Sequence, residues 1–225
     1  SIVRDDENLP IELKVARAQS SAISPDGKQL AFVYRGEVFV TSTDYSTTKQ
    51  ITHTAAAEKS PTWGDNRTLV YTSERSGISQ LIRATSGRDE DLNFPNATSI
   101  KEEVLLSSKT DERTYPSFSP DGHNIAFVRD NNIFLVKMLF NNAEVQVTKD
   151  GELGKIRNGI PDWAYEEEFG VTRAYEFSAD SRMLAWIRFD ESQVGSYELP
   201  FFLSNPDRNA YSQELVSYRP QQYPT

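Results

Sequence analysis

Short runs of alternating apolar and polar residues recur along this chain, and each run comes after a turn signal. The segment SPDGKQLAFV (residues 24–33) recurs as SPDGHNIAFV (residues 119–128), and weaker copies span residues 63–71 and 177–186. Asp-Gly pairs supply the positive φ angles of a tight hairpin, and β-branched and aromatic residues suit a pleated, half-buried surface. The pattern therefore predicts a series of β-hairpins.

The segments immediately downstream of the two best copies also repeat. Residues 36–40 and 131–136 predict a further strand after a Gly or Asn turn, and residues 49–52 and 145–148 predict short, polar-edged strands. Four short strands per unit, repeated at roughly 40–60 residues, are typical of a β-propeller blade. The alternative, a β-sandwich of similar strands, is disfavoured because the two best copies are so alike.

The copies begin near residues 24, 64, 119 and 178, so we predict an all-β chain of about four blades, each a four-stranded antiparallel sheet. Four blades are the lower limit for a closed propeller. The chain is thus either a small closed propeller or, preferably, part of a larger one. We expect residues 1–19 to be a linker or a strand that completes another blade. Residues 20–112 and 113–225 would each form two blades.

Composition narrows the function classes. The 225 residues include 33 acidic and 24 basic residues, a formal net charge of −9, which argues against a nucleic-acid partner. Without cysteine there is no disulfide and no thiolate metal site. No apolar run reaches the ~18 residues that a membrane-spanning helix needs, so we expect no membrane span. Neither a metal nor a cofactor is expected.

The main chemical signal is an acidic string flanked by aromatic residues, DWAYEEEF (residues 162–169). Adjacent carboxylates repel one another, so a chain that keeps three together either leaves them in water or holds a cationic ligand. We expect Asp162 to cap a short helix that carries the glutamates in its first turn, where the positive helix end offsets part of their repulsion.

Residues 114–225 resemble the propeller domain of the dipeptidyl peptidase IV family of serine peptidases. The resemblance rests on FSPDG (residues 118–122), NNIF (131–134), NGIPDWAYEEEF (158–169) and LAWIRFDE (184–191). The acidic string is specific to that family, whereas the other matches are common in propellers. Gly195 comes after Val194 where the family usually has proline, so the match weakens toward the end of the chain.

The resemblance implies that Glu167 and Glu168 bind the free α-amino group of a peptide, with Glu166 in a supporting role. Two carboxylates give an ammonium charge-assisted hydrogen bonds. They also select for length, because only a peptide whose second residue reaches the nucleophile can place its amine there, so that dipeptides are released. The family further uses an arginine upstream of the glutamates to hold the substrate carbonyl. Arg113 and Lys109 are the nearest candidates.

Residues 20–112 resemble instead the WD40-like propeller repeats of tricorn-type and TolB-type proteins, through SPDG (24–27), GEVFV (36–40) and KQIT (49–52). The chain could therefore be a hybrid joined near residues 108–118. One relative that matches both halves continuously would contradict this hypothesis. Both resemblances imply a bacterial periplasmic or secreted location.

The chain lacks the catalytic residues of this family, which lie in an α/β-hydrolase domain after the propeller. It has no Gly-x-Ser-x-Gly nucleophile elbow, and its two histidines, His53 and His123, fit turn and edge positions. We therefore predict a substrate-gating propeller portion that binds peptide N-termini, works with a separate hydrolase domain and hydrolyses no peptide alone. Homo-oligomer formation is left open.

The alternative is a non-enzymatic scaffold, TolB-like or engineered, that presents loops to protein partners. Glutamates 166–168 pointing to open solvent rather than to a central cavity would favour that alternative.

Overall fold

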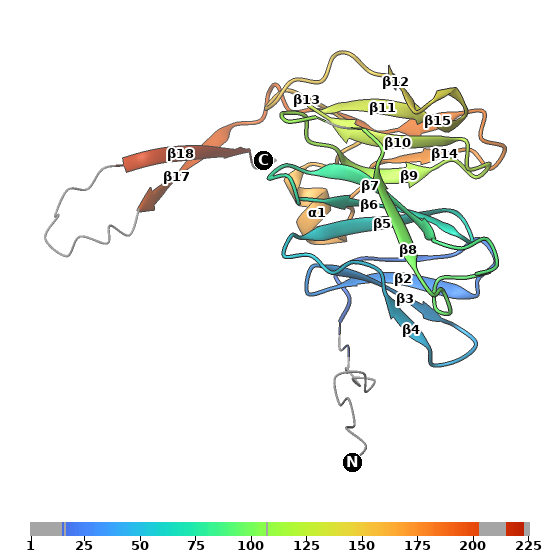
Figure 1. Cartoon of the computed structure of the whole chain (residues 1–225). Helices are drawn as coiled ribbons and strands as arrows, with labels where there is room; N and C mark the ends of the chain where they lie inside the picture. Colours follow the sequence, from blue (N-terminus) through green and yellow to red (C-terminus); the bar gives the residue numbers. More distant parts are fainter. Residues whose placement is uncertain (1–14, 16, 107, 203–214, 223–225) are drawn as a thin grey trace, which may run out of the picture.

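Three complete antiparallel sheets stack face to face to form most of the molecule (Figure 1). The computed structural model describes residues 15, 17–106, 108–202 and 215–222. Blade 1 consists of β1 (Ser21–Ile23), β2 (Gln29–Tyr34), β3 (Glu37–Ser42) and β4 (Thr48–Gln50). Blade 2 consists of β5 (Glu58–Asp65), β6 (Thr68–Ser73), β7 (Gln80–Ser86) and β8 (Ile100–Val104). Blade 3 consists of β9 (Thr114–Phe118), β10 (Asn124–Arg129), β11 (Asn132–Lys137) and β12 (Ala143–Gln146), with the 3-10 helix η2 (Met138–Phe140) before its last strand.

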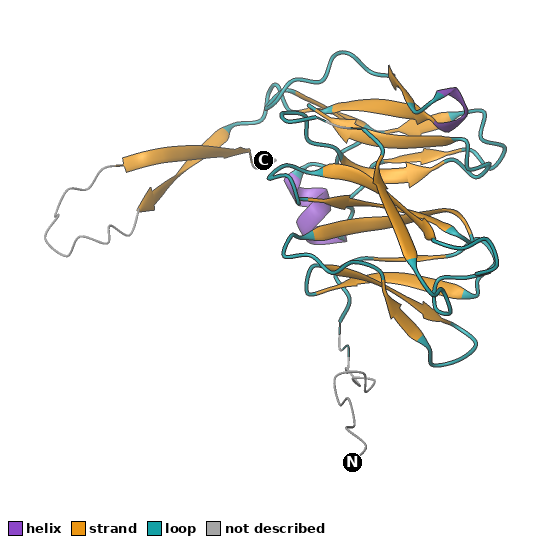
Figure 2. Ribbon diagram, in the orientation of Figure 1, coloured by secondary structure: helices purple, strands orange, loops and turns teal. Residues whose placement is uncertain are grey.

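The fourth blade is built differently. Its first two strands, β14 (Tyr175–Phe177) and β15 (Leu184–Trp186), form a two-stranded sheet. The next strand, β16 (Arg188–Asp190), pairs instead with β13 (Ile156–Asn158), and the helix α1 (Trp163–Phe169) lies between β13 and β14 in the chain. Strands β17 (Ser196–Phe202) and β18 (Leu215–Gln222) pair only with each other among the described strands and project from the blades (Figure 2).

The architecture confirms the all-β prediction of propeller blades made of antiparallel sheets. Three of the four expected blades have four strands in simple sequential order, and the fourth has a two-stranded inner part. Residues 1–14, for which a linker or blade-completing strand is predicted, lie outside the described residues. No helix among the described residues is long and apolar enough to cross a membrane.

The repeated Ser-Pro-Asp-Gly turns fold identically in blades 1 and 3. The hydroxyl of Ser24 donates to Asp26 at 2.7 Å, and that of Ser119 donates to Asp121 at 2.5 Å. The next glycines, Gly27 and Gly122, have φ angles of 72° and 70°, which a residue with a Cβ rarely adopts. The turn chemistry therefore explains why these two sequence copies are so similar.

Adjacent blades pack face to face. We call the front face of a blade the side that carries Phe32 and Phe39 in blade 1, and the back face the opposite side. The back face of blade 1, with Ala31, Val33, Val38 and Val40, packs against the front face of blade 2, with Leu69, Tyr71, Ile82 and Ala84. The back of blade 2, with Val70 and Leu81, packs against the front of blade 3, with Ile125, Phe127, Phe134 and Val136. The core is thus a series of layers between sheets.

The interface between blades 3 and 4 obeys the same rule. Ala126, Val128 and Ile133 on the back of blade 3 contact Tyr175 of β14. The buried hydroxyl of Tyr175 donates to the carbonyl oxygen of Ala126 at 2.9 Å and also to that of Tyr115. Blade 4 is therefore fixed to blade 3 by both apolar packing and hydrogen bonds.

The connection between β7 and β8, residues 87–99, is an insertion that reaches back to blade 1, and we call it the clasp loop. Its Phe94 is fully buried, stands edge-on to Trp63 with ring centroids 5.6 Å apart, and donates its backbone N–H to the Gln29 side chain at 2.9 Å. The equivalent connection in blade 3 is the short 3-10 helix η2. Although this insertion is polar overall, it contributes two buried residues to the core, Phe94 and Ala97.

Candidate functional site: the acidic turn and its surroundings

The acidic string folds as the short helix α1. Asp162 is the N-cap residue, and its carboxylate accepts the backbone N–H of Tyr165 at 2.9 Å. The helix ends at Gly170, whose φ of 64° and backbone N–H bond to Glu166 form a left-handed C-cap. The prediction of an Asp-capped helix is therefore confirmed.

The three glutamates are all solvent-exposed in this chain. Only Glu166 lies in the first turn of α1, so the expectation that all three lie there is wrong. The helix begins at Trp163, which places Glu167 and Glu168 too far along for the positive helix end to offset much of their repulsion. No ion pair engages any of the three carboxylates within the described ranges. They are therefore accessible to a cation.

Aromatic contacts hold α1 against the small sheet of β13 and β16. The Tyr165 ring meets Phe189 of β16 edge-on at 5.4 Å between centroids and lies 5.5 Å from Phe169. A polar network fixes the same sheet, because Asp150 accepts from Arg188 at 2.7 Å and from Asn158 at 2.9 Å. The position of the glutamates thus depends on a sheet that brings together two distant segments.

The helix lies close to a pocket where the inner ends of four blades converge. This axial pocket, of about 140 Å³, is lined by pairs of residues from successive blades, namely Ser20, Ser21, Ser60, Pro61, Tyr115, Pro116, Thr172 and Arg173. Burial raises the pKa of Tyr115, the charge of Glu166 adds to that rise, and Arg157 and Lys59 oppose it. Glu166 therefore lies within electrostatic reach of a residue that lines the axial pocket.

Arg113, a predicted carbonyl-binding residue, is buried between blades 2 and 3. Only 4% of its side chain is exposed, and its guanidinium contacts Glu144 at 3.3 Å and lies over the ring of Phe127 at 5.8 Å. Arg129 joins this cluster through a 2.6 Å bond to Glu144. The guanidinium of Arg113 also donates to the side chain of Gln80 in blade 2 at 3.5 Å, so Arg113 links blade 3 to blade 2. Lys109, the other candidate, is exposed.

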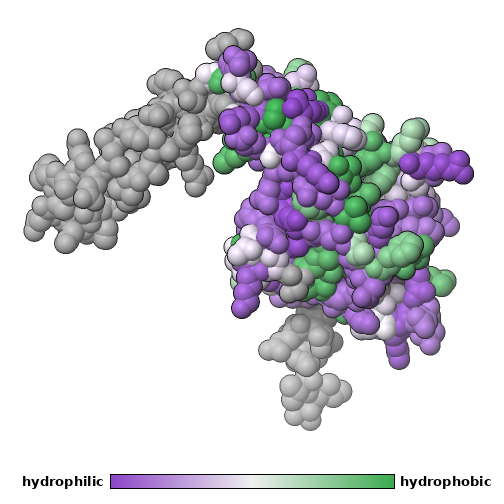
Figure 3. Space-filling view, turned by 90° about the horizontal axis from the view of Figure 1, so that it is seen from above, coloured by the Kyte–Doolittle hydropathy of each residue, from purple (hydrophilic) through white to green (hydrophobic). Residues whose placement is uncertain are grey.

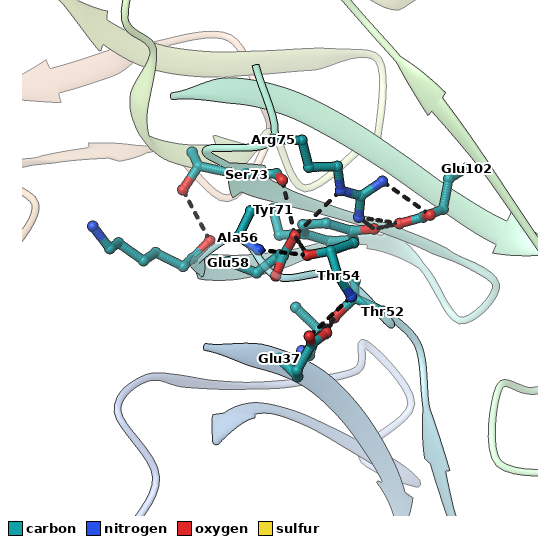
Figure 4. Close-up of polar contacts among 12 residues, drawn as sticks. Glu37, Thr52, Thr54, Ala56, Glu58, Tyr71, Ser73, Arg75 and Glu102 are labelled. Carbon is teal, nitrogen blue, oxygen red and sulfur yellow. Dashed lines mark hydrogen bonds and ion pairs between the residues drawn. The ribbon is translucent and has the colours of Figure 1, made fainter. Parts of the chain in front are cut away.

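A second arginine cluster, which sequence reasoning missed, is centred on Arg75 at the connection of β6 and β7 (Figure 4). Arg75 makes a bidentate contact with Glu102 at 2.7 and 3.0 Å and lies 3.3 Å from the fully buried Glu58. The hydroxyl of Tyr71 also donates to Glu102. Arg75 is thus rigidly held, yet 30% of its side chain remains exposed.

Hydrogen bonds and charge shift the ionisation of this cluster. The pKa of Glu102 is lowered because hydrogen bonds from Arg75 and Tyr71 outweigh its burial, and burial together with Glu102 raises the pKa of Tyr71. No sequence signal marks Arg75, since Glu102 lies on another strand and only folding brings the two together.

Both histidines lie at exposed positions. His53 is exposed, and His123 lies in the exposed turn of blade 3 with its Nδ1 3.5 Å from Asp121. Within the described part of the chain, no group of three or more His, Cys, Asp or Glu side chains could hold a metal ion.

Comparison with known protein families matches residues 88–225 to the N-terminal region of dipeptidyl peptidase IV. The chain belongs to the dipeptidyl peptidase IV N-terminal region family. The acidic turn, the blades of residues 114–190 and the β17–β18 hairpin all fall inside this match.

Individual relatives agree with the family. A probable dipeptidyl peptidase 4 of Aspergillus fumigatus is 38% identical over 119 residues, and a probable dipeptidyl-aminopeptidase B of Podospora anserina is 44% identical over 90 residues. These alignments cover 52% and 40% of this chain but only 15% and 10% of those proteins. The chain therefore corresponds to a small part of each relative.

Two solved structures are similar in fold. Porphyromonas gingivalis dipeptidyl peptidase 4 matches 96% of this chain and 32% of its own, with a TM-score of 0.61 and 26% identity. A putative TolB from Agrobacterium tumefaciens matches 80% of this chain and 59% of its own, with a TM-score of 0.50 and 16% identity. The predicted similarity to both groups is confirmed, the second at the level of the fold.

The hybrid hypothesis is not confirmed. The family match begins at residue 88, upstream of the proposed junction at residues 108–118, and the match to the P. gingivalis structure runs across that junction.

Proposed function

We propose that this chain is the substrate-gating propeller portion of a dipeptidyl peptidase, in which Glu167 and Glu168 bind the N-terminal amine of a peptide. The observation that carries the proposal is the family's acidic string, folded as a capped helix beside the pocket where the blades converge. Two adjacent, unpaired carboxylates suit a compact ammonium with three donors. Glu166, whose charge acts on Tyr115, would add to the negative field.

We assign the carbonyl-binding role that the resemblance implies to Arg75 rather than to Arg113. Arg113 would have to leave a buried ion pair, whereas Arg75 is partly exposed and already oriented by Glu102. Arg75 contacts Glu58, and the next residue, Lys59, lies within electrostatic reach of Tyr115, as Glu166 does. An arginine held by a bidentate carboxylate keeps further N–H donors for a carbonyl oxygen.

We expect this chain to supply no catalytic nucleophile, because its sequence contains no Gly-x-Ser-x-Gly elbow. We expect an α/β-hydrolase domain elsewhere in the parent protein to perform acyl transfer, and we expect no turnover of a Gly-Pro chromogenic substrate by this chain alone. A periplasmic or secreted location for the parent is part of the same proposal.

The test is made in the parent peptidase. Glu167→Gln combined with Glu168→Gln should lower kcat/KM for a Gly-Pro substrate by about 100-fold or more, because two charge-assisted hydrogen bonds are lost. Glu90→Gln, on the exposed clasp loop, is the control for the loss of a distant surface carboxylate and should leave kcat/KM unchanged. Equal losses in both variants, or unchanged activity in the double variant, would contradict the amine site.

A second candidate function is a non-catalytic scaffold for protein partners. The exposure of Glu166, Glu167 and Glu168 in this chain favours it. The two candidates differ in their ligand: an amine site requires a free peptide N-terminus, so N-acetylated peptides should not compete, whereas a scaffold surface would bind both forms equally.

A further inference from the structure

The clasp loop creates a second pocket, which lies where the loop meets blade 1 and which the proposed peptidase function does not use. This clasp pocket has a volume of about 230 Å³ and is lined by Asp26, Lys28, Asp44, Tyr45, Leu92 and Asn93, together with Gln29 and Ser42. Loops that are inserted into a rigid scaffold often carry binding sites. The pocket is smaller than the roughly 300–1,000 Å³ of drug-sized sites, so it suits a single side chain.

The walls of the clasp pocket are held in place from both sides. Asn96 of the clasp loop donates its side-chain amide to the Tyr45 hydroxyl at 2.6 Å, and the Gln29 side chain accepts the N–H of Phe94 and donates to the carbonyl oxygen of Asn66 at 2.8 Å. Phe94 anchors the loop in the core. The pocket therefore exists before any ligand binds, which lowers the entropic cost of binding.

Its charge is negative. The pocket and the adjoining stretch of the clasp loop contain five carboxylates, at residues 26, 44, 89, 90 and 91, against the cations Lys28 and Arg88. Asp26 is engaged by Ser24 and the Lys28 backbone. In contrast, no hydrogen bond or ion pair engages the Asp44 carboxylate in the part of the chain that the structure describes. Asp44 can therefore accept from a cationic ligand.

The remaining walls favour a flat cation with an apolar stem. Tyr45 and Leu92 are 44% and 76% exposed, and both line the pocket. Guanidinium groups stack on aromatic rings, are weakly hydrated and bind carboxylates in a fork, whereas an ammonium is a strongly hydrated point charge. The aliphatic part of an arginine side chain could cover Leu92 while its head group reaches Asp44.

We propose that the clasp pocket binds an arginine side chain presented by a protein partner, with Asp44 as the ion-pair acceptor and Tyr45 as the stacking surface. The matching turn of blade 3 has the same Ser-Pro-Asp-Gly sequence but no clasp loop. Asp121 of that turn corresponds to Asp26 and lies outside the clasp pocket, so it serves as a control for the loss of an exposed carboxylate elsewhere on the chain.

The proposal can be tested by titrating this chain with the blocked peptide Ac-Gly-Arg-Gly-NH2 and monitoring amide chemical shifts. We expect saturable binding whose largest shifts map to residues 42–45 and 92–93. Asp44→Asn and Tyr45→Ala should each raise the Kd by about fivefold or more, while Asp121→Asn should leave it unchanged. Circular dichroism checks that each variant is folded, which is expected because all three positions are exposed.

Two further peptides define the chemistry. The citrulline peptide, which keeps the shape but lacks the charge, should bind at least about fivefold more weakly, and so should the lysine peptide. The proposal is overturned if the arginine peptide shows no saturable binding, if the citrulline or lysine peptide binds equally well, or if Asp121→Asn weakens binding as much as Asp44→Asn.

Discussion

The front faces of blades 1 and 3 carry the same pair of phenylalanines in the same geometry, but within the described residues only the pair of blade 3 is covered by another blade. In blade 1, Phe32 and Phe39 form a cross-strand pair with ring centroids 5.5 Å apart and planes inclined by 14°. In blade 3, Phe127 and Phe134 form the equivalent pair at 5.6 Å and 18°. Phe127 and Phe134 are buried by blade 2, whereas Phe32 and Phe39 are only half-buried.

The difference shows that strand pairing sets the geometry of these side chains and that the neighbouring blade sets their burial. Each sheet closes its own hydrogen bonds, so a blade can form locally. Apolar area leaves water mainly when two sheets meet, and that burial is the main favourable term in folding. Most of the stability of this chain should therefore reside between blades.

In the view of Figure 3, hydrophobic side chains are scattered among polar ones on the outer surface.

The largest contrast is expected for truncation of the paired phenylalanines. Phe127→Ala should lower the free energy of unfolding by about 3–5 kcal/mol, because it leaves a cavity between two sheets. Phe32→Ala should cost about 1 kcal/mol, because its side chain already contacts water. Urea denaturation monitored by circular dichroism measures both. Similar losses for the two variants would show that strand pairing, rather than blade stacking, dominates stability.

A smaller contrast is expected for the arginines at the ends of these faces. Arg113→Ala removes a buried ion pair and a ring contact in blade 3 together with a hydrogen bond to Gln80 of blade 2, and should cost about 2–4 kcal/mol. Arg35→Ala removes an exposed contact with Tyr34 in blade 1 and should change stability by no more than about 0.5 kcal/mol. The same urea titration measures both. A smaller loss of stability for Arg113→Ala than for Arg35→Ala would show that the Arg113 cluster does not stabilise the blade interface.

The smallest effects are expected at the two Ser-Pro-Asp-Gly turns, where blades 1 and 3 should lose equal amounts of stability. Hydrogen bonds from Ser24 and Ser119 lower the pKa of Asp26 and of Asp121. An acid whose pKa is lowered by folding stabilises the folded state above its unfolded pKa, and this contribution disappears as pH falls through the folded value.

At pH 7, Asp26→Asn and Asp121→Asn should therefore each cost only a few tenths of a kcal/mol, since both carboxylates are exposed. The cost should shrink progressively as the urea titrations are run below pH ~4, where the unfolded aspartates begin to bind protons. Unequal costs at pH 7 would mean that neighbouring blades influence even these local turns.

Much of the fold could be predicted because its signals are local. The Asp-Gly turns at residues 26–27 and 121–122 and the two-residue alternation after them predict hairpins in blades 1 and 3, and the structure has them. The pairing of β16 with β13 could not be predicted, because it departs from the sequential order of the other blades. The burial of Phe94 also had no signal, since a single aromatic in a polar loop does not reveal a partner.

The part of the candidate site that could be predicted is the part formed by consecutive residues, the acidic string of residues 162–169. The cap at Asp162 and the adjoining helix come from adjacent residues, so the sequence specifies them. Arg113 illustrates the opposite case, because its burial depends on Glu144 and Phe127, which are far away in the chain. The cluster around Arg75 is likewise assembled from three strands and carries no local pattern.

The pairing of β13 with β16 has a mechanical consequence. Three residue pairs between β13 and β16 hold together the two ends of the segment that connects them, residues 159–187. That segment contains α1 and the first hairpin of blade 4. The segment is therefore a closed ring of backbone that should open as one cooperative unit in hydrogen exchange. Strain applied to the glutamate helix would be transmitted to the innermost strand of blade 4, and a force on that strand would in turn reach the glutamates.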